Sequence, residues 1–365
     1  MRHLIPAVLT ALAFSALLIS CKKNDNAGPQ GPADLRDSVV LAGLTLPWEI
    51  LWGPDNHIWF TERGGRISRF NPATGDRTTL FNVPDVVSQG EGGLMGMVLH
   101  PSFSSQPYVY IVYNYTNAGQ YREKIVRYTY GNNTLQAPLN LIENIPAANV
   151  HNGSRLVIVG DKLFASTGDA NNTALAQNVS SPAGKILRLN LDGTIPSDNP
   201  VSGNPYWSLG HRNPQGLVYA RNMLYSTEHG PSSDDEVNII EKGRNYGWPD
   251  VAGFCDSPAE QTFCNAQNVM QPLREWTPTI APSGLDYYTN DAIPQWKNSL
   301  LFTTLKNTRL YQLELSDDGR SITNVNEFYN NTWGRLRDIC IATTGEVYLC
   351  TSNGSNDRIV QISKK

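Results

Sequence analysis

The sequence has few charged residues and no excess of basic ones. Only 17% of its 365 residues are Asp, Glu, Lys or Arg, whereas typical globular chains carry roughly 25%. This shortage argues against helical bundles and coiled coils, which are rich in Glu and Lys. The 29 basic and 33 acidic residues give a net charge of −4. No positive excess can neutralise a phosphate backbone, so we expect no nucleic-acid partner.

Cysteine is also scarce, with five residues, and none of them lies in a CxxC or Cys/His pattern typical of zinc sites. In an oxidising compartment the last four would form two disulfides. Proximity favours Cys255–Cys264 and Cys340–Cys350, and a short hairpin loop centred on Gly345 would place the second pair opposite each other. The alternative is four free, buried thiols.

The N-terminus has the pattern of a secretory signal. Arg2 precedes an apolar run that ends in Leu18-Ile19-Ser20-Cys21, a sequence that resembles the bacterial lipoprotein box. We expect a lipoprotein signal peptide over residues 1–20, a lipid anchor at Cys21 and a flexible tether over residues 21–37 that is rich in Pro, Gly and charge. These features place the protein in the cell envelope. The alternative is an ordinary signal peptide with an incidental cysteine.

One pattern of short apolar strands and turns recurs six times. The repeats begin near Trp48, Leu94, Ser154, Gln215, Ser283 and Leu336, which are 46 to 68 residues apart. With 30 Gly, 23 Pro and 16 Tyr, the chain is turn-rich but too aromatic to be disordered. The repeats predict one all-β domain over residues 38–365, a six-bladed β-propeller of four-stranded antiparallel sheets. Residues 39–44 would supply the outer strand of the last blade. A β-sandwich or β-helix is the rival fold, but neither has this period.

Polar residues that are unusual for a scaffold are concentrated in a few loops. His151 precedes one strand and Asp169 follows the next, so antiparallel pairing would bring them to the same sheet end as a general base and its orienting carboxylate. Arg212, in the segment LGHRNPQG, could polarise a carbonyl or hold an anion. The alternatives are a surface histidine, a turn aspartate and an arginine that braces neighbouring loops.

Two further segments favour ion binding. In EHGPSSDDE, carboxylates that include Asp235 and Glu236 lie near a Gly-Pro turn that exposes backbone carbonyls, a donor set suited to Ca²⁺. The downstream residues Tyr246, Ala252, Phe254 and Asp256 could add oxygen ligands. Lys306, Arg335 and Arg337 form a cationic group, and the two arginines would share one face of a strand and suit a polycarboxylate or phosphate. A solvated acidic turn and surface arginines are the alternatives.

The order of these motifs resembles the soluble pyrroloquinoline quinone (PQQ)-dependent glucose dehydrogenases and the related aldose sugar dehydrogenases. The resemblance runs from about residue 40 to the C-terminus and rests on the segments EGGLMGMVLHPSF, HNGSRLVI, STGD, LGHRNPQGL, EHGPSSDDEVNIIEKGRNYGWPDVAG, WTPTIAPSG, LKN and GRLRD. The segments GHRNPQG and DDE to NYGWP are specific to the family, whereas the single strands are not.

The resemblance implies a role for each matching residue. His151 is similar to the family's general base, Asp169 to its orienting carboxylate and Arg212 to the residue that stabilises charge on the quinone oxygens. Positions that line PQQ or hold its carboxylates correspond to Asn213, Gln215, Thr279, Lys306, Arg335 and Arg337. The carbonyls of Gly230 and Pro231 match ligands of the calcium that activates PQQ. Residues that hold structural calcium in some members correspond to Asp235, Glu236, Tyr246, Ala252, Phe254 and Asp256.

The activity implied by the resemblance is oxidation of the C1 hydroxyl of an aldose. His151 would take the hydroxyl proton, hydride would pass from C1 to PQQ, and the products would be a lactone and reduced PQQ, reoxidised by an external acceptor of quinone or cytochrome type. A homodimer is compatible with the resemblance. Glu91, at a cofactor-pocket position where the glucose enzymes have Gln, and Val150, which replaces an Asp, are departures that weaken a glucose preference.

Two other functions remain open from the sequence. A calcium-dependent lactonase or esterase on the same fold would need a metal and acid–base groups but no quinone, which would leave Lys306, Arg335 and Arg337 without a task. A non-catalytic propeller that binds a partner or glycan would not need His151 and Arg212 to converge. The fold by itself does not decide among these functions.

Overall fold

The strands form six antiparallel sheets of four strands each, numbered here as blades in chain order. Blades 1 and 2 comprise β2 (Pro47–Trp52), β3 (Ile58–Glu62), β4 (Arg66–Phe70) and β5 (Arg77–Asn82), then β6 (Leu94–Leu99), β7 (Tyr108–Asn117), β8 (Gln120–Gly131) and β9 (Thr134–Pro146). Blades 3 and 4 comprise β10 (Gly153–Val159), β11 (Lys162–Thr167), β12 (Lys185–Asn190) and β13 (Tyr206–Leu209), then β14 (Pro214–Ala220), β15 (Met223–Glu228), β16 (Asp235–Ile240) and β17 (Arg274–Trp276). Blades 5 and 6 comprise β18 (Pro282–Tyr288), β19 (Ser299–Thr304), β20 (Leu310–Leu315) and β21 (Ile322–Phe328), then β22 (Leu336–Ile341), β23 (Val347–Thr351), β24 (Asp357–Lys364) and β1 (Leu35–Leu44).

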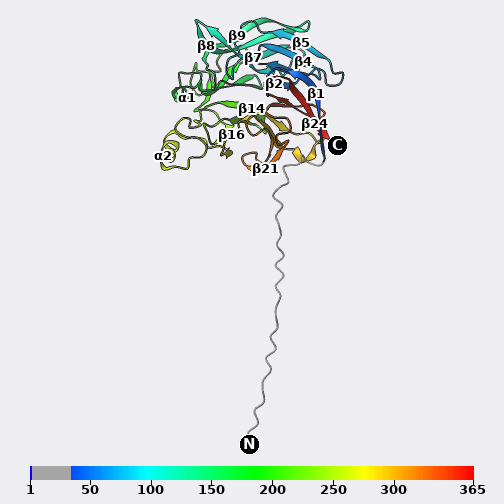
Figure 1. The fold of residues 1–365 in the computed structure, drawn as a ribbon. Coiled ribbons are helices and arrows are strands. Elements are labelled where there is room, and N and C mark those ends of the chain that lie inside the picture. Colours follow the sequence, from blue (N-terminus) through cyan, green and yellow to red (C-terminus); the bar gives the residue numbers. More distant parts are fainter. Residues whose placement is uncertain (2–33) are drawn as a thin grey trace.

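The blades close into a ring (Figure 1). Their first strands contact one another in the order β2, β6, β10, β14, β18 and β22, and β22 contacts β2 again. This computed structural model describes Met1 and residues 34–365. The expected six-bladed propeller is confirmed. The signal peptide beyond Met1, the lipid site at Cys21 and the tether up to residue 33 lie outside the described residues.

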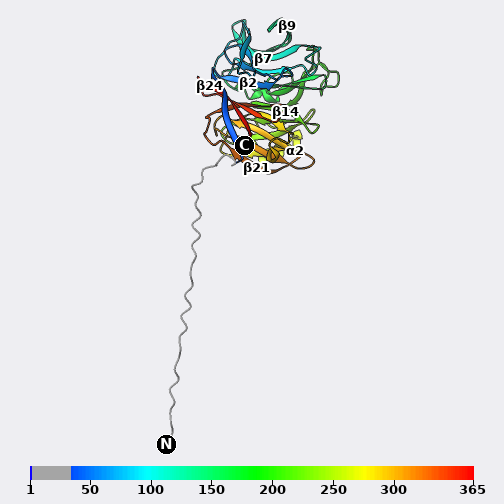
Figure 2. The same ribbon diagram turned by 90° about the vertical axis from the view of Figure 1, so that its right-hand side faces the viewer.

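The N-terminal strand completes the last blade. β1 pairs with β24 from Leu35 opposite Lys364 to Leu44 opposite Asp357, and the two strands lie side by side in both views (Figures 1 and 2). The prediction that residues 39–44 close the ring is therefore confirmed. The strand begins earlier than expected, so residues 35–37 belong to the sheet and not to the tether.

The core lies between the blades, because each sheet packs both of its faces against neighbours. Strands such as β3 and β19 are consequently buried along their whole length. This explains why each contains three consecutive apolar residues, Ile58–Phe60 and Leu300–Phe302, in place of an alternating pattern. Trp59 of blade 1, for example, packs edge-on against Phe103 and Tyr130 of blade 2, with ring centroids 5.6 and 5.1 Å apart. Such contacts hold neighbouring blades together.

Antiparallel pairing places the start of each first strand and the end of each second strand at the same rim of the ring. The first strand of each blade starts at this rim and the second strand returns to it, as the pairs Gly153–Thr167 and Pro214–Glu228 show for blades 3 and 4. Residues just before first strands and just after second strands therefore gather there. We call this edge the loop rim.

Within residues 34–365 helices are few and short. They are α1 (Ala174–Gln177), α2 (Pro258–Gln267) and the 3₁₀ turn η1 (Pro294–Trp296). Ser257 caps α2, and its side chain and that of Glu260 form a reciprocal capping box. Across the described part of the chain, no helix has the length and apolar character needed to cross a membrane.

One of the two expected disulfides is present. Cys255 and Cys264 are bonded, which links the segment before α2 to its last turns. The expected Cys340–Cys350 bond is wrong, because both thiols are free and buried. In the β22–β23 hairpin Cys340 lies opposite Tyr348 and Cys350 lies opposite Asp338. The loop between Ile341 and Val347 is longer than assumed, so the two cysteines are diagonal and not opposite each other.

Candidate active site

A cleft at the loop rim collects side chains from all six blades. It consists of two adjoining cavities of about 470 and about 210 Å³ that share Glu91, His229 and Ala281 as lining residues. Other residues of the larger cavity include Arg63, Gln215, Lys306, Arg335 and Arg337. Other residues of the smaller cavity include His151, Arg212, Asn213, Gly230, Pro231, Asp235 and Thr279. Most of the residues predicted from the sequence therefore converge on one cleft.

His151 and Asp169 form a hydrogen-bonded pair beside the smaller cavity. The His151 Nδ1 lies 2.9 Å from Oδ1 of Asp169, and Asp169 is fully buried. A carboxylate can only accept, so Nδ1 carries the proton and donates it to Asp169. The lone pair of Nε2 is then available, and among the described residues Nε2 has no hydrogen-bond partner. This is the arrangement of a general base with its orienting group.

The segment that carries His151 has an unusual backbone. His151, Gly153 and Ser154 all have positive φ, at 59°, 66° and 76°. A Cβ at Gly168 would lie 1.9 Å from the His151 carbonyl oxygen, so the close approach of the two loops requires glycine. A buried hydrogen bond helps to fix this strained segment: Ser154 Oγ donates to the Glu123 carboxyl at 2.6 Å. Burial raises the pKa of Glu123 to about 8.

Neighbouring loops fix the segment further. Asn213, from the loop before β14, accepts the Gly153 backbone N–H on its side-chain oxygen at 3.0 Å. Asn213 also accepts from the side-chain amide of Gln215 at 3.3 Å. The His151 backbone N–H points to Glu91 Oε2, 3.4 Å away. Three residues predicted to bind the cofactor are thus part of this network. Asn213 and Glu91 contact the segment that carries His151, and Gln215 contacts Asn213.

Arg212 lies at the wall of the smaller cavity. Its guanidinium donates to the His229 carbonyl at 3.2 Å and lies 5.3 Å above the Trp248 ring, while its buried Nε has no partner among the described residues. Burial lowers the pKa of Arg212, although nearby carboxylates oppose the shift. The Arg212 carbonyl accepts the Asp169 backbone N–H at 2.8 Å. This hydrogen bond therefore connects Arg212 directly to the His151–Asp169 pair.

The larger cavity has a strongly cationic lining. Arg337 is buried and donates to the side-chain oxygens of Gln215 and Ser283 at 2.5 and 3.3 Å. Burial lowers its pKa to about 10, and the neighbouring Arg155, Arg335 and Arg63 contribute to this shift while Glu91 opposes it. The Nε atom of Arg337 has no partner in the described part of the chain. Such a guanidinium is suited to an anionic ligand.

The exposed members of this cationic group are held more loosely. Lys306 donates to the Thr279 hydroxyl, and Arg335 donates to the Leu305 carbonyl at 3.4 Å. Both side chains line the larger cavity together with Arg337. The predicted grouping of Lys306, Arg335 and Arg337 therefore exists in space, although the three residues come from two different blades.

Sequence reasoning missed several residues of the cleft. Arg63 follows β3 in an ordinary hairpin turn, TERGGR, which carries no signal of function. His229 lines both cavities, and its Nε2 lies 2.8 Å from the Pro282 carbonyl. Desolvation, followed by the charges of Arg337 and Arg212, lowers the pKa of His229 to about 3. Because His229 directly precedes Gly230, which was predicted as a site residue, its position in the sequence could have indicated that it lies in the cleft.

The predicted metal residues separate into distinct places. The carbonyls of Gly230 and Pro231 belong to loop residues that line the cleft, and among the described residues no backbone donor is bonded to either oxygen. Phe254 and Asp256 lie near the start of α2 and are exposed, away from the cavities. Asp235 uses Oδ1 to accept from Gly230 N at 2.8 Å and Oδ2 to accept from Ile280 and Ala281. Its carboxylate therefore braces the loops of the cleft.

The remaining three metal candidates surround a small polar cavity of about 10 Å³. Glu236, Tyr246 and Ala252 line it with Glu228 and Trp248. Burial, and then the charge of Glu228, raises the pKa of Glu236 to about 8. No cluster of three or more His, Cys, Asp or Glu side chains suited to a metal occurs within residues 34–365. A cation here would need backbone carbonyls as additional ligands.

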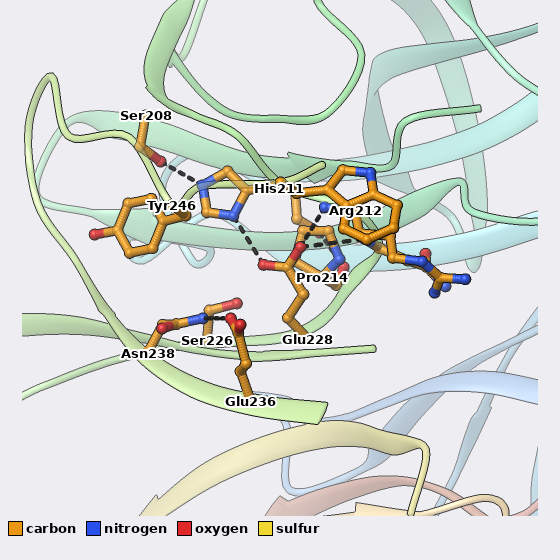
Figure 3. A network of polar contacts seen from close by, with 12 residues as sticks. Ser208, His211, Arg212, Pro214, Ser226, Glu228, Glu236, Asn238 and Tyr246 are labelled. Carbon is orange, nitrogen blue, oxygen red and sulfur yellow. Dashed lines mark hydrogen bonds and ion pairs between the residues drawn. The ribbon is translucent and has the colours of Figure 1, made fainter. Parts of the chain in front are cut away.

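His211 stabilises the wall between this cavity and the cleft. It is fully buried, and its ring is bonded to Ser208 and Glu228, both at 2.8 Å, and stacked on Tyr246 (Figure 3). Glu228 in turn accepts the backbone N–H groups of Arg212 and Asn213. The histidine of GHRNPQG therefore acts on the backbone next to Arg212 and does not reach the cleft.

Comparison with known proteins gives consistent matches over nearly the whole propeller. The sequence model of the Glucose / Sorbosone dehydrogenase family matches residues 44–361. Quinoprotein glucose dehydrogenase B of Acinetobacter calcoaceticus is 34% identical over 411 aligned residues, covering 87% of this chain and 85% of that protein. Aldose sugar dehydrogenase YliI of Escherichia coli K12 is 32% identical over 346 residues, covering 89% and 92%. The PQQ-bound aldose sugar dehydrogenase of Streptomyces coelicolor superposes with a TM-score of 0.79 at 32% identity, covering 92% of this chain and 100% of that one.

Proposed function

The chain belongs to the glucose/sorbosone dehydrogenase family, and from this premise we propose that it oxidises the C1 hydroxyl of aldose sugars to the lactone with PQQ as its cofactor. The family membership confirms the resemblance carried by the sequence motifs and makes the protein a sugar dehydrogenase of the quinoprotein type. The cofactor, the calcium requirement, the product and the residue roles are our proposal.

The cleft fits PQQ, a planar compound with three carboxylates. Five cationic side chains line its two cavities, namely Arg63, Arg212, Lys306, Arg335 and Arg337. The buried Nε atoms of Arg212 and Arg337 lack partners among the described residues. Buried donors of this kind are costly unless a ligand satisfies them. Among the described residues none of these five cations forms an ion pair, and this concentration of unpaired positive charge in a charge-poor protein is the observation that carries the proposal.

The cleft also offers oxygen ligands for Ca²⁺. The Gly230 and Pro231 carbonyls fit a hard cation that prefers oxygen, and the Asp235 carboxylate fixes their loop through Gly230 N. We propose a calcium ion at these carbonyls, and a second one at the small cavity lined by Glu236, Tyr246 and Ala252. A bound cation would offset the mutual repulsion of Glu236 and Glu228.

His151 and Asp169 carry out the acid–base part of the proposed reaction. His151 Nε2 accepts the proton of the sugar C1 hydroxyl, while Asp169 holds the ring and stabilises the imidazolium that forms. Arg212 supplies positive charge beside the reacting centre. Bound PQQ supplies the two-electron acceptor for the hydride released from C1, and an external quinone or cytochrome-type acceptor takes the electrons onward.

Substrate choice is set by residues around His151. Glu91 is exposed in the cleft with its carboxylate 3.4 Å from the His151 backbone nitrogen, and Val150 also lines the smaller cavity. The family's glucose enzymes carry Gln and Asp at these two positions. We therefore propose a broad aldose range in place of a strict glucose preference.

Reconstitution tests the proposed activity. The apoprotein is incubated with PQQ and Ca²⁺, given a panel of aldoses and an artificial electron-accepting dye, and the sugar product is identified. We expect dye reduction that depends on PQQ, with one lactone formed per two electrons transferred. Omitting PQQ is the control. Dye reduction without PQQ, or none with any aldose after PQQ has bound, would contradict the proposal.

The direction of β1 shows at which edge of the ring the N-terminal segment enters the propeller. β1 begins at Leu35 opposite Lys364, whereas its other end pairs with Asp357, which binds the backbone of Asn353 at the cleft. The tether thus joins the ring at the edge away from the loop rim. We propose that Cys21 is lipidated in the cell envelope, so that the tether leaves the cleft free to meet soluble sugars. Loss of membrane association in a Cys21→Ser variant is the test.

A further inference from the structure

One indole touches both groups that the proposed reaction depends on. Trp248 Nε1 donates to Asp169 Oδ2 at 2.9 Å, and the Arg212 guanidinium carbon lies 5.3 Å from the centroid of the Trp248 ring. Asp169 belongs to blade 3 and Arg212 precedes blade 4, whereas Trp248 lies in the long connection between β16 and β17. The tryptophan therefore bridges segments that are distant in sequence.

The Asp169 carboxylate accepts three hydrogen bonds, which are distributed over its two oxygens. Oδ1 accepts from His151 Nδ1 at 2.9 Å and from the Asn171 backbone at 2.8 Å. The other oxygen, Oδ2, accepts from Trp248 Nε1. With both oxygens engaged, the carboxylate cannot rotate without breaking a bond. Because Asp169 is fully buried, no water can replace a lost donor without opening the site.

The position of the indole is itself fixed by its backbone. The Trp248 N–H donates to the Gly210 carbonyl at 3.0 Å. The Trp248 carbonyl accepts from the Gln177 side-chain amide at 2.7 Å, and Gln177 is the last residue of α1. These two bonds fix the Trp248 backbone, and from that backbone the indole N–H reaches Asp169.

We propose that Trp248 is a positioning residue for the reaction, which holds the Asp169 carboxylate so that His151 presents Nε2 to the cleft and which supports the guanidinium of Arg212. This inference rests on the proposed function, because it assigns Trp248 to the same site. It adds a third member to the His151–Asp169 pair. Trp248 lines the small cavity beside Glu236 but neither of the two cavities of the cleft, so within the cleft it acts through Asp169 and Arg212.

The test replaces the indole N–H and keeps an aromatic ring. Trp248→Phe should lower kcat roughly tenfold, since a lost hydrogen bond to a buried charge weakens the geometry of the base, and should leave KM and PQQ binding unchanged. Trp207→Phe is the matched control, because Trp207 is also half-buried but lies against Phe164 and Arg188, away from the cleft. Its kcat should equal that of the parent.

A double-mutant cycle separates positioning from general loss of structure. In an Asp169→Ala background, Trp248→Phe should have little further effect on kcat, because the two residues act through one bond. A full additional loss would show that Trp248 does not act through Asp169 and would overturn the inference. Equal kcat for Trp248→Phe and parent would overturn it as well.

A readout on the apoprotein keeps this inference distinct from the proposed activity. In ¹⁵N spectra of labelled histidine rings, the His151 Nδ1–H signal is identified by its loss in His151→Ala. Trp248→Phe should speed exchange of this proton with water, whereas Trp207→Phe should not. Faster exchange in a protein that shows no PQQ-dependent activity would show that Trp248 holds the His151–Asp169 pair, but it would reject the proposed function and with it a role for Trp248 in that reaction. Unchanged exchange would reject the inference even in an active enzyme.

Discussion

Replacing Arg337 by Met should stabilise the apoprotein and weaken cofactor binding at the same time. Arg337 is only 6% exposed, and its pKa falls from the ordinary 12.5 to about 10, chiefly through burial. That change corresponds to about 3 kcal/mol of unfavourable free energy for the charged group in the folded protein. Because the folded pKa of this cation lies below its unfolded pKa, the destabilisation is fully present at every pH below about 10.

Two hydrogen bonds offset part of this gain. Arg337→Met leaves the side-chain oxygens of Gln215 and Ser283 without the guanidinium donor, at about 1 kcal/mol each. The net expectation is a more stable apoprotein by about 1 kcal/mol at pH 7. Conversely, the loss of a charge-assisted bond to a carboxylate of PQQ should weaken binding roughly ten- to a hundredfold.

Denaturant unfolding of the apoprotein and fluorescence titration with PQQ measure these two effects. Arg320→Met is the control, because Arg320 is exposed and forms only a surface ion pair with Glu241, and both quantities should match the parent. If Arg337→Met proved less stable than the parent and bound PQQ equally well, Arg337 would be a structural brace. The assignment of the larger cavity to an anionic cofactor would then fail.

Three further perturbations have defined outcomes. Burial raises the pKa of Glu123 to about 8, so the free energy of unfolding of the parent should fall as the pH rises from about 4.5 to 8. Glu123→Gln cannot ionise and should not show this fall. In denaturant unfolding at pH 9 the variant should be more stable than the parent by up to about 5 kcal/mol. Cys255→Ser opens a short loop, with a sequence separation of 9, and should lower the free energy of unfolding by about 3 kcal/mol; an unchanged midpoint would show that the bond is irrelevant to stability. Added Ca²⁺ should raise the Tm of Glu236→Gln by less than that of the parent, because only the site at the Gly230 and Pro231 carbonyls remains in the variant, and an equal rise in both would remove Glu236 from the metal site.

The repeat pattern was sufficient to predict the blades, because each blade opens with a short apolar strand after a turn. The expected starts at Leu94 and Leu336 are the first residues of β6 and β22, and the expected start at Trp48 is one residue from that of β2. Closure by residues 39–44 could be predicted because this apolar segment precedes the first repeat and the last blade lacked an outer strand. Blade starts are local features, and local sequence contains them.

Features that depend on register or on distant contacts could not be predicted. The Cys340–Cys350 bond was wrong because the loop length that sets the pairing of β22 with β23 is not visible in the residue types. Trp248 lies within the NYGWP segment, but its contact with Asp169 depends on how the insertion of blade 4 folds over blade 3. Arg63 reaches the cleft from a hairpin turn that looks like any other.

His151 is the residue on which the proposed PQQ-dependent sugar oxidation depends most, because it takes the hydroxyl proton in this cleft. The most direct measurement compares the parent and His151→Ala, each saturated with PQQ in the presence of Ca²⁺, for aldose-dependent dye reduction. If His151 is the base, His151→Ala binds PQQ as the parent does and its turnover falls by at least about a hundredfold. Dye reduction by the variant at the parent's rate would contradict it.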